Sequence, residues 1–298
     1  MAGPPAGAVQ VKVRGTTKVV GLLGWPVEHS MSPAMHNAAF REAGLNYTYV
    51  PFPVQPEHLA KAVDAIRALN LAGANVTIPH KVAVMQYLDE IDEDAQKIGA
   101  VNTIVNVQGR LVGYNTDGQG FIRSLEEQGI GIKAAKVVLM GAGGAARAVV
   151  AALLSAGAAS VTIAARSGDK ANRLAGHYGS SAVTGIDWQS EVLSRRLAEC
   201  DLLINATPLG MAPAVEKIPP VNWPVLASRT IVCDLIYNPL MTRFLQQAKE
   251  RGHRVVTGEG MLAGQGALAF QIWTKTAAPY DVMAGNLLQQ LKEQQENC

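Results

Sequence analysis

Three short polar segments carry the side chains best suited to chemistry. They are residues 29–33 (HSMSP), 75–81 (NVTIPHK) and 115–118 (NTDG), and each lies at or just after the end of an expected strand. Open α/β sheets bind ligands at that end of their strands, so the three segments are expected to meet. Lys81 and Asp117 together make a workable proton relay for interconverting an alcohol and a ketone. The hydroxyl and amide groups around them suit a polyhydroxylated substrate.

Each of these residues also has a purely structural interpretation. Serine caps helices, and Asp in an Asn-Thr-Asp-Gly run makes turns. Ser32 before Pro33 is expected to be the N-cap of a helix, and Lys81 is expected in the first turn of a helix after Pro79. The combination of the three segments, rather than any single residue, favours a catalytic site.

A glycine-rich loop gives a second signal. Residues 141–146 (GAGGAA) directly follow an expected strand and open an expected helix, which is a GxGxxA form of the dinucleotide fingerprint. Glycines let the backbone approach a pyrophosphate, and the helix N-terminus supplies N–H donors. Glycine richness alone is weak evidence, because turns are commonly glycine-rich. The position of the loop between a strand and a helix is what predicts dinucleotide binding. The predicted pyrophosphate-binding residues are Gly141, Ala142, Gly143, Gly144 and Ala145.

The tip of the next strand indicates which dinucleotide binds. An NAD site needs Asp or Glu there for the ribose 2′-OH, whereas an NADP site has a cation for the 2′-phosphate. This chain has Ala165, Arg166 and Ser167, followed by Lys170. Arg166 can stack on adenine and bind the phosphate through its planar fork, while Lys170 adds charge and Ser167 adds a donor. A solvated basic loop diluted by Asp169 is the alternative, and we favour NADP.

Length and composition exclude several classes of protein. The chain has 298 residues, of which 48% are hydrophobic and 17% charged, so it is globular rather than disordered. Lys and Arg number 26 against 24 Asp and Glu, and aromatic residues make up 5%, which argues against nucleic-acid binding. The scattered Cys200, Cys233 and Cys298 have no zinc spacing; we expect no metal site and reduced thiols, as in the cytoplasm.

No membrane or secretion segment is expected. The N-terminal residues lack the apolar run of a signal peptide. Residues 148–165 carry no charge, but the turn-like run SAGAAS at 155–160 breaks them into a helix and a buried strand.

Strand and helix patterns alternate along the chain. Expected strands cover 18–23, 74–78, 137–140, 161–164, 202–205 and 230–234, with a hairpin of 101–107 and 111–114. Expected helices cover 32–44, 56–70, 145–155, 242–251 and 261–276. Repeated βα units predict an α/β fold with a parallel sheet covered on both faces.

The motifs resemble those of the shikimate dehydrogenases, from about residue 19 to residue 288. The matching blocks are HSxSPxxHN at 29–37, GANVTIPHK at 73–81, GAVNT at 99–103, NTDGxG at 115–120, GAGGAAR at 141–147, NATPLGM at 205–211 and GEGMLAGQGALAFQIW at 258–273. The resemblance implies a reversible, NADP-linked reduction of 3-dehydroshikimate to shikimate, a step toward aromatic amino acids.

The resemblance also implies roles for individual residues. Lys81 and Asp117 match the catalytic pair. The residues that would hold the hydroxyls and carboxylate of the substrate are Ser30, Ser32, Thr77, Asn102 and Gln265, with Tyr237 close by. Those that would bind the cofactor, besides the glycine loop and the strand tip, are Thr207, Leu235 and Gly258 near the nicotinamide, and Glu93 beside the catalytic region.

Two departures from the family pattern bear on specificity. The family usually has Asn where this chain has Ala165, and often Arg where it has Lys170, so selectivity for NADP is expected to be looser. The quinate-using branch often alters the serine pair or the strand-tip charge; Ser32 and Arg166 therefore favour shikimate and NADP.

A non-catalytic relative would lack Lys81 or Asp117, and a folate-linked dehydrogenase would lack the HSxSP and NTDG pairing.

The implied architecture has two domains with a cleft between them. A Rossmann-type, doubly wound parallel cofactor domain is expected over 117–258. An α/β substrate domain is expected from 1–116 together with a returning segment, 259–298. The expected partner is a small-molecule substrate, without nucleic acid or membrane, and a homodimer is one possible assembly.

Overall fold

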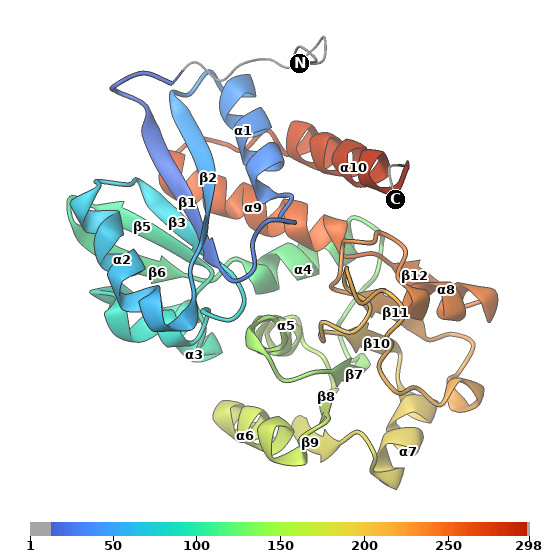
Figure 1. Cartoon of the computed structure of the whole chain (residues 1–298). Helices are drawn as coiled ribbons and strands as arrows, with labels where there is room; N and C mark the ends of the chain where they lie inside the picture. Colours follow the sequence, from blue (N-terminus) through green and yellow to red (C-terminus); the bar gives the residue numbers. More distant parts are fainter. Residues whose placement is uncertain (1–12, 297–298) are drawn as a thin grey trace.

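The computed structural model describes residues 13–296 and places two six-stranded sheets in separate halves of the molecule (Figure 1). Helices α4 (Asp117–Glu126) and α9 (Glu259–Thr274) pack against each other between the sheets. The chain leaves the first half through α4 and returns to it through α9. The predicted α/β architecture of two domains, one of them a Rossmann-type doubly wound sheet, is confirmed.

The first sheet is mixed and has the order β2-β1-β3-β5-β6-β4. Its strands are β1 (Lys18–Gly24), β2 (Tyr47–Pro53), β3 (Gly73–Val76), β4 (Glu90–Ile91), β5 (Thr103–Val107) and β6 (Arg110–Tyr114). Strand β1 pairs in parallel with β2 and β3, and the predicted hairpin of β5 and β6 is antiparallel. The helical segments of this half are α1 (Ser32–Glu42), η1 (Pro56–His58), α2 (Leu59–Ala68), η2 (Ala83–Tyr87), α3 (Glu93–Ile98) and α10 (Tyr280–Glu296).

The second sheet is parallel throughout, with the order β12-β11-β10-β7-β8-β9. This is the strand order of a doubly wound dinucleotide-binding sheet. Its strands are β7 (Lys136–Met140), β8 (Ser160–Ala165), β9 (Val183–Asp187), β10 (Leu202–Asn205), β11 (Ile231–Asp234) and β12 (Val255–Val256). Its helical segments are α5 (Gly144–Ser155), α6 (Gly168–Tyr178), α7 (Glu191–Glu199), η3 (Trp223–Val225) and α8 (Arg243–Glu250).

Burial on both faces explains the apolar strands of this sheet. In β7, Val137 and Leu139 belong to one buried cluster, whereas Val138 and Met140 belong to another. Alternate side chains of a strand point to opposite faces, so a strand covered on both sides must be apolar at every position.

The last two helices complete the core of the first half. Val20 of β1, Met35 of α1, Phe270 of α9 and Leu287 of α10 are buried in one cluster. Segments more than 200 residues apart thus share a core, as the predicted returning segment requires. Among the described residues no helix has the length and apolar character of a membrane span.

Two local predictions near the polar segments are wrong. Ser32 is the first residue of α1 rather than its N-cap, which is Met31 without a side-chain cap. Lys81 lies in a turn before η2, not in the first turn of a helix. The backbone oxygen of Lys81 accepts a hydrogen bond from the N–H of Val101 (2.8 Å), so this segment is tied to a distant loop instead of continuing into a helix.

The close crossing of α4 and α9 predicts that a methyl group added at Gly120 destabilises the protein. A Cβ at Gly120 would lie 2.5 Å from the backbone N of Gln265, so Gly120→Ala must push the helices apart. Overpacking of this kind costs about 1–3 kcal/mol, and we expect the free energy of unfolding in urea to fall. Gly176→Ala in α6 is the control, because nothing lies within 4 Å of its Cβ position; it should stabilise the protein by about 0.5–1 kcal/mol. Equal stabilisation by both substitutions would contradict the close crossing.

Candidate functional site

Lys81 and Asp117 form a shielded ion pair. Lys81 Nζ lies 2.5 Å from Asp117 Oδ2, and the two side chains are 16% and 5% exposed. Lys81 comes from the turn after β3, and Asp117 is the first residue of α4. Asp117 thus stands at the N-terminus of α4, the end of a helix where negative side chains interact favourably with the helix dipole.

Asn102 orients the carboxylate of this pair. Its Nδ2 donates to Asp117 Oδ1 (2.8 Å) and to Thr116 Oγ1 (2.9 Å), while its Oδ1 accepts from the N–H of Thr116 (2.9 Å). These bonds fix which way the amide points and leave Asp117 Oδ2 facing Lys81. Asn102 Nδ2 also lies 3.3 Å from Gln265 Oε1, so the network includes the returning helix α9. The structure therefore brings together four of the predicted residues.

Tyr237 connects the second half to the serine segment of the first. It follows β11, and burial raises its pKa, with hydrogen bonds from the Ser30 side chain and the Met31 backbone acting in the opposite direction. Ser32 is buried; burial raises the pKa of Tyr49, and the Ser32 side chain acts against that rise. Thr77 is half-buried in the loop that leads from β3 to Lys81. The predicted substrate residues thus lie in connected loops of both halves.

A buried polar wall behind this site contains Asn75, which lies in the predicted polar segment 75–81, and Tyr49 and His36, which the sequence analysis did not single out as site residues. Tyr49 Oη donates to Asn75 Oδ1 (2.8 Å), and Asn75 Nδ2 donates to the backbone oxygen of Asn102 (3.0 Å). His36 stacks on Tyr49 with ring centroids 4.6 Å apart, and burial lowers the pKa of His36 to about 3, so the ring is neutral. Asn75 could be found from its motif, but Tyr49 sits in a strand with no polar pattern around it.

The glycine loop adjoins Lys81. Gly141 has φ +120°, and a Cβ there would meet the backbone oxygen of Ala206 at 2.8 Å, so the turn requires glycine. Gly143 faces open space, which leaves room for a pyrophosphate at the start of α5. A Cβ at Gly144 would lie 3.1 Å from Lys81 Cβ. The half-buried Ala142 and Ala145 complete this loop, which fits a dinucleotide.

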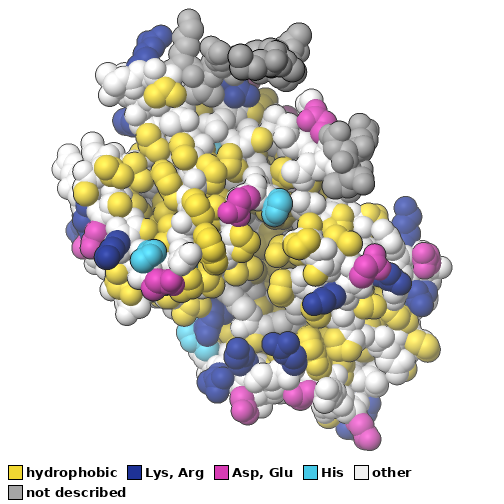
Figure 2. All heavy atoms as spheres, in the orientation of Figure 1, with side chains coloured by type: hydrophobic (Ala, Val, Ile, Leu, Met, Phe, Trp, Pro, Cys, Tyr) yellow, Lys and Arg dark blue, Asp and Glu magenta, His cyan; other side chains and the backbone are white. Residues whose placement is uncertain are grey.

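The tip of β8 presents two cations to solvent. Arg166 and Lys170 are exposed, and neither forms an ion pair with a described residue; Ala165 is buried at the strand end. The Ser167 side chain caps α6 by accepting from the N–H of Lys170 (3.4 Å), and Asp187 Oδ2 accepts from the N–H of Gly168 (3.3 Å). Lys and Arg side chains gather near α6 on the face shown in Figure 2. The arrangement suits a phosphate.

The three residues predicted near the nicotinamide lie at neighbouring strand ends. Thr207 Oγ1 donates to Asn205 Oδ1 (2.7 Å), and the N–H of Leu235 donates to the Asn205 backbone oxygen (3.0 Å). Gly258 precedes α9, and a Cβ there would meet the backbone oxygens of Ile236 (2.5 Å) and Leu235 (2.6 Å). Thr207, Leu235 and Gly258 are therefore packed around one corner of the second sheet.

Glu93 lies apart from this network. Its side chain is 91% exposed on α3 and faces Lys97 Nζ at 3.8 Å, so the structure does not join it to Lys81 or Asp117. Across residues 13–296 no group of three or more His, Cys, Asp or Glu side chains could hold a metal ion.

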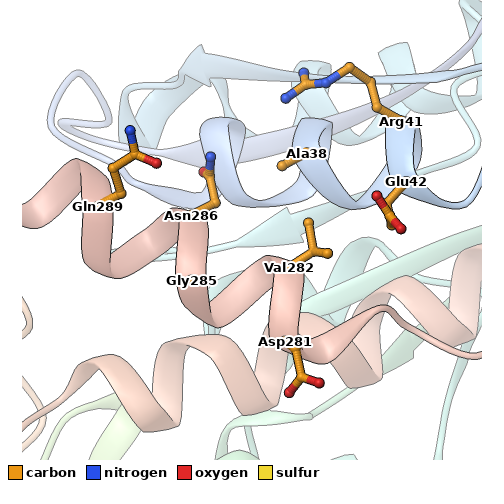
Figure 3. A pocket seen from close by; sticks show the side chains of 8 residues that line it. All are labelled: Ala38, Arg41, Glu42, Asp281, Val282, Gly285, Asn286 and Gln289. Atoms are coloured by element: carbon orange, nitrogen blue, oxygen red, sulfur yellow. The ribbon is translucent and has the colours of Figure 1, made fainter.

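A surface hollow of about 550 Å³ lies between α1 and α10 (Figure 3). Arg41, Glu42 and Asp281 are among its lining residues, and none of the predicted site residues is. The hollow is thus a separate feature of the first half.

A doubly wound sheet whose dinucleotide loop adjoins a buried lysine–aspartate pair defines a class, the two-domain nicotinamide-dependent dehydrogenases. Three family models match the chain: the shikimate dehydrogenase substrate binding domain over 22–104, shikimate/quinate 5-dehydrogenase over 124–214, and the shikimate 5′-dehydrogenase C-terminal domain over 258–287. The chain belongs to the shikimate dehydrogenase family.

Individual relatives agree with this family. The shikimate dehydrogenase (NADP⁺) of Desulforamulus reducens is 50% identical over 284 residues, which cover 94% of this chain and 98% of that protein. The crystal structure of shikimate 5-dehydrogenase from Thermus thermophilus with NADP(H) and shikimate has a TM-score of 0.83 and 37% identity, covering 92% and 99% of the two chains. Quinate dehydrogenase from Corynebacterium glutamicum with NAD has a TM-score of 0.82 and 31% identity, covering 92% and 99%.

The exposed cations predict a cofactor-specific defect. Arg166→Ala should weaken NADP⁺ binding about tenfold to more than a hundredfold, because a charge-assisted hydrogen bond contributes about 1.5–3 kcal/mol. NAD⁺ binding should hardly change, since it lacks the 2′-phosphate. Calorimetry with both cofactors measures this, and Arg195→Ala on the exposed face of α7 is the control. Equal weakening of both cofactors would show that Arg166 does not bind the 2′-phosphate.

Proposed function

We propose that this protein reversibly reduces 3-dehydroshikimate to shikimate with NADPH, as a step in the biosynthesis of aromatic amino acids. The observation that carries the proposal is the closeness of Lys81, the partner of Asp117, to the glycine loop, where a Cβ at Gly144 would lie 3.1 Å from Lys81 Cβ. It puts an acid–base pair beside the loop that fits the cofactor. The names of the relatives support the same reaction and the same cofactor.

Lys81 and Asp117 move the proton in this proposal. When bound, the nicotinamide exchanges a hydride with the carbon that carries the reacting oxygen. Lys81 Nζ donates a proton to that oxygen during reduction and receives it back during oxidation. Asp117 Oδ2, 2.5 Å from Nζ, keeps the amine oriented, and Asn102 prevents the carboxylate from turning away.

The substrate is held between the two halves. Ser30 and Ser32 at the start of α1 offer hydroxyl donors for its carboxylate, and Tyr237 reaches the same segment from the second sheet. Thr77, Asn102 and Gln265 offer the groups for its hydroxyls. Because these side chains come from both halves, binding of the substrate also sets the position of the two halves.

The domain limits and the cellular setting complete the proposal. We assign 1–116 and 259–298 to the substrate domain and 117–258 to the NADP-binding domain, with the boundaries at the starts of α4 and α9. A cytoplasmic location agrees with the buried, free thiols of Cys200 and Cys233. Assembly as a homodimer stays a prediction.

The test compares substrates and cofactors in one assay. The absorbance of reduced nicotinamide is followed with shikimate or quinate, each with NADP⁺ or NAD⁺. We expect the highest kcat/KM for shikimate with NADP⁺, because the strand tip has cations and no carboxylate. Reactions without the acid substrate are the control. Equal kcat/KM for NAD⁺, or a preference for quinate, would contradict the proposal and favour the quinate-using branch.

A further inference from the structure

Asp234 is a buried carboxyl group that the proposed reaction does not use. It is the last residue of β11, at the strand ends that carry Thr207 and Leu235, and it is 1% exposed. Burial raises its pKa to about 7, with hydrogen bonds from Thr242, Ile236 and Asn205 acting against the shift. Such a group is costly to bury, so its contacts need an explanation.

Three donors from three different segments converge on this carboxyl group. Thr242 Oγ1, at the start of α8, donates to Asp234 Oδ2 (2.6 Å). Asn205 Nδ2, from the end of β10, donates to Oδ1 (3.0 Å). The N–H of Ile236, in the loop that leads to Tyr237, donates to the same oxygen (3.0 Å).

The bond to Asn205 determines how its amide is oriented. Because Nδ2 must face Asp234, Asn205 Oδ1 is turned toward Thr207, where it accepts from both Oγ1 (2.7 Å) and the backbone N–H (3.0 Å). Asn205 Nδ2 also donates to the Leu209 backbone oxygen (3.2 Å). Asp234 therefore acts on the loop of Thr207 through Asn205.

The bond to Ile236 fixes the other loop. Residues 235–237 carry Leu235 and Tyr237, and the backbone oxygens of Leu235 and Ile236 pack against Gly258 at the start of α9. One carboxyl group thus ties the loop of Thr207 to the loop of Tyr237.

We propose that Asp234 is a positioning residue for hydride transfer. Through Asn205 it fixes the position of Thr207 beside the nicotinamide, and through Ile236 it fixes the position of Tyr237 beside the substrate. The inference rests on the proposed function, since it assumes that these loops meet cofactor and substrate. Asp234 itself touches neither. A displacement of about 1 Å between reacting groups can slow a reaction about a hundredfold, so the link has consequences for the rate.

The test separates the rate of hydride transfer from cofactor binding. Asp234→Ala removes all three acceptor contacts, and we expect single-turnover oxidation of NADPH by 3-dehydroshikimate to slow about 10- to 100-fold. The dissociation constant of NADP⁺ should stay within about threefold, with one site per chain, because the glycine loop and Arg166 bind the rest of the cofactor. A merely destabilised protein would instead lose binding sites.

Two further variants keep the inference falsifiable. Asp234→Asn retains an oxygen that can accept from Asn205 and Ile236, so its rate should stay within about threefold of wild type. Thr242→Val removes the bond to Oδ2 together with the N-cap bond that Thr242 Oγ1 accepts from the N–H of Leu245 (3.3 Å), and it leaves the bonds of Asn205 and Ile236 to Oδ1 in place. It is used if Asp234→Ala does not fold, and it should slow hydride transfer severalfold. Asp201→Ala, a carboxylate at the opposite end of the same sheet that accepts from the N–H of Lys136 (2.9 Å), is the control and should leave the rate unchanged.

The outcomes distinguish this inference from the proposed function. A wild-type protein that turns over neither shikimate nor 3-dehydroshikimate refutes the function. If the wild-type protein is active and Asp234→Ala transfers hydride at the same rate, the positioning role is refuted. If Asp234→Ala does not fold and Thr242→Val is used instead, a wild-type rate in Thr242→Val refutes the role in the same way. Equal losses in Asp234→Asn and Asp234→Ala would show that the charge, not the geometry, matters, and would also overturn the inference.

Discussion

The rest of the structure depends on holding Lys81 and Asp117 at ion-pair distance in a site shielded from water. Removing two charges from water is costly, and their attraction offsets this only when the geometry is good and further hydrogen bonds are made. Here Asn102 Nδ2 donates to the second carboxylate oxygen of Asp117, the first residue of α4. Lys81 and Asn102 lie in two separate loops, and Asp117 begins α4 after β6, so the mixed first sheet must hold all three.

The connection between the halves follows from the same requirement. Helix α4 begins at Asp117 and crosses α9 where Gly120 meets the backbone of Gln265. The glycine contact lets the helices approach closely enough for Gln265 Oε1 to lie 3.3 Å from Asn102. The segment that returns from the cofactor-binding half therefore takes part in the site of the first half.

The parts of the fold that the sequence predicts well are those set by local pattern. Strands β7, β8, β10 and β11 of the second sheet are mostly apolar, and their ends are predicted within one residue because burial on both faces favours that composition. The pattern does not predict strand β2, since two prolines interrupt it. It mistakes the turn at Lys81 for a helix because the backbone partner of that turn, Val101, lies 20 residues away.

In the candidate site, too, the sequence predicts the residues that a local pattern marks and misses those that depend on distant partners. The polar motifs supply Lys81, Asp117 and the glycine loop, since residue type and place after a strand suffice to single them out. The roles of Tyr49 and Asp234 depend on partners far along the chain, Asn75 and Asn205, which a local pattern does not identify. Asp234 did carry one usable signal, a carboxylate directly after the apolar run IVC at a strand end.

A double-mutant cycle on the ion pair tests the central claim most directly. Lys81→Ala and Asp117→Asn are compared singly and together by kcat for shikimate oxidation, with NADP⁺ binding as the check on folding. If the two residues act as one unit, each single change should lower kcat about 10²–10⁴-fold, and the double variant should be little worse than either. A double variant whose loss equals the product of the single losses would show that Lys81 and Asp117 act separately, and would contradict the account.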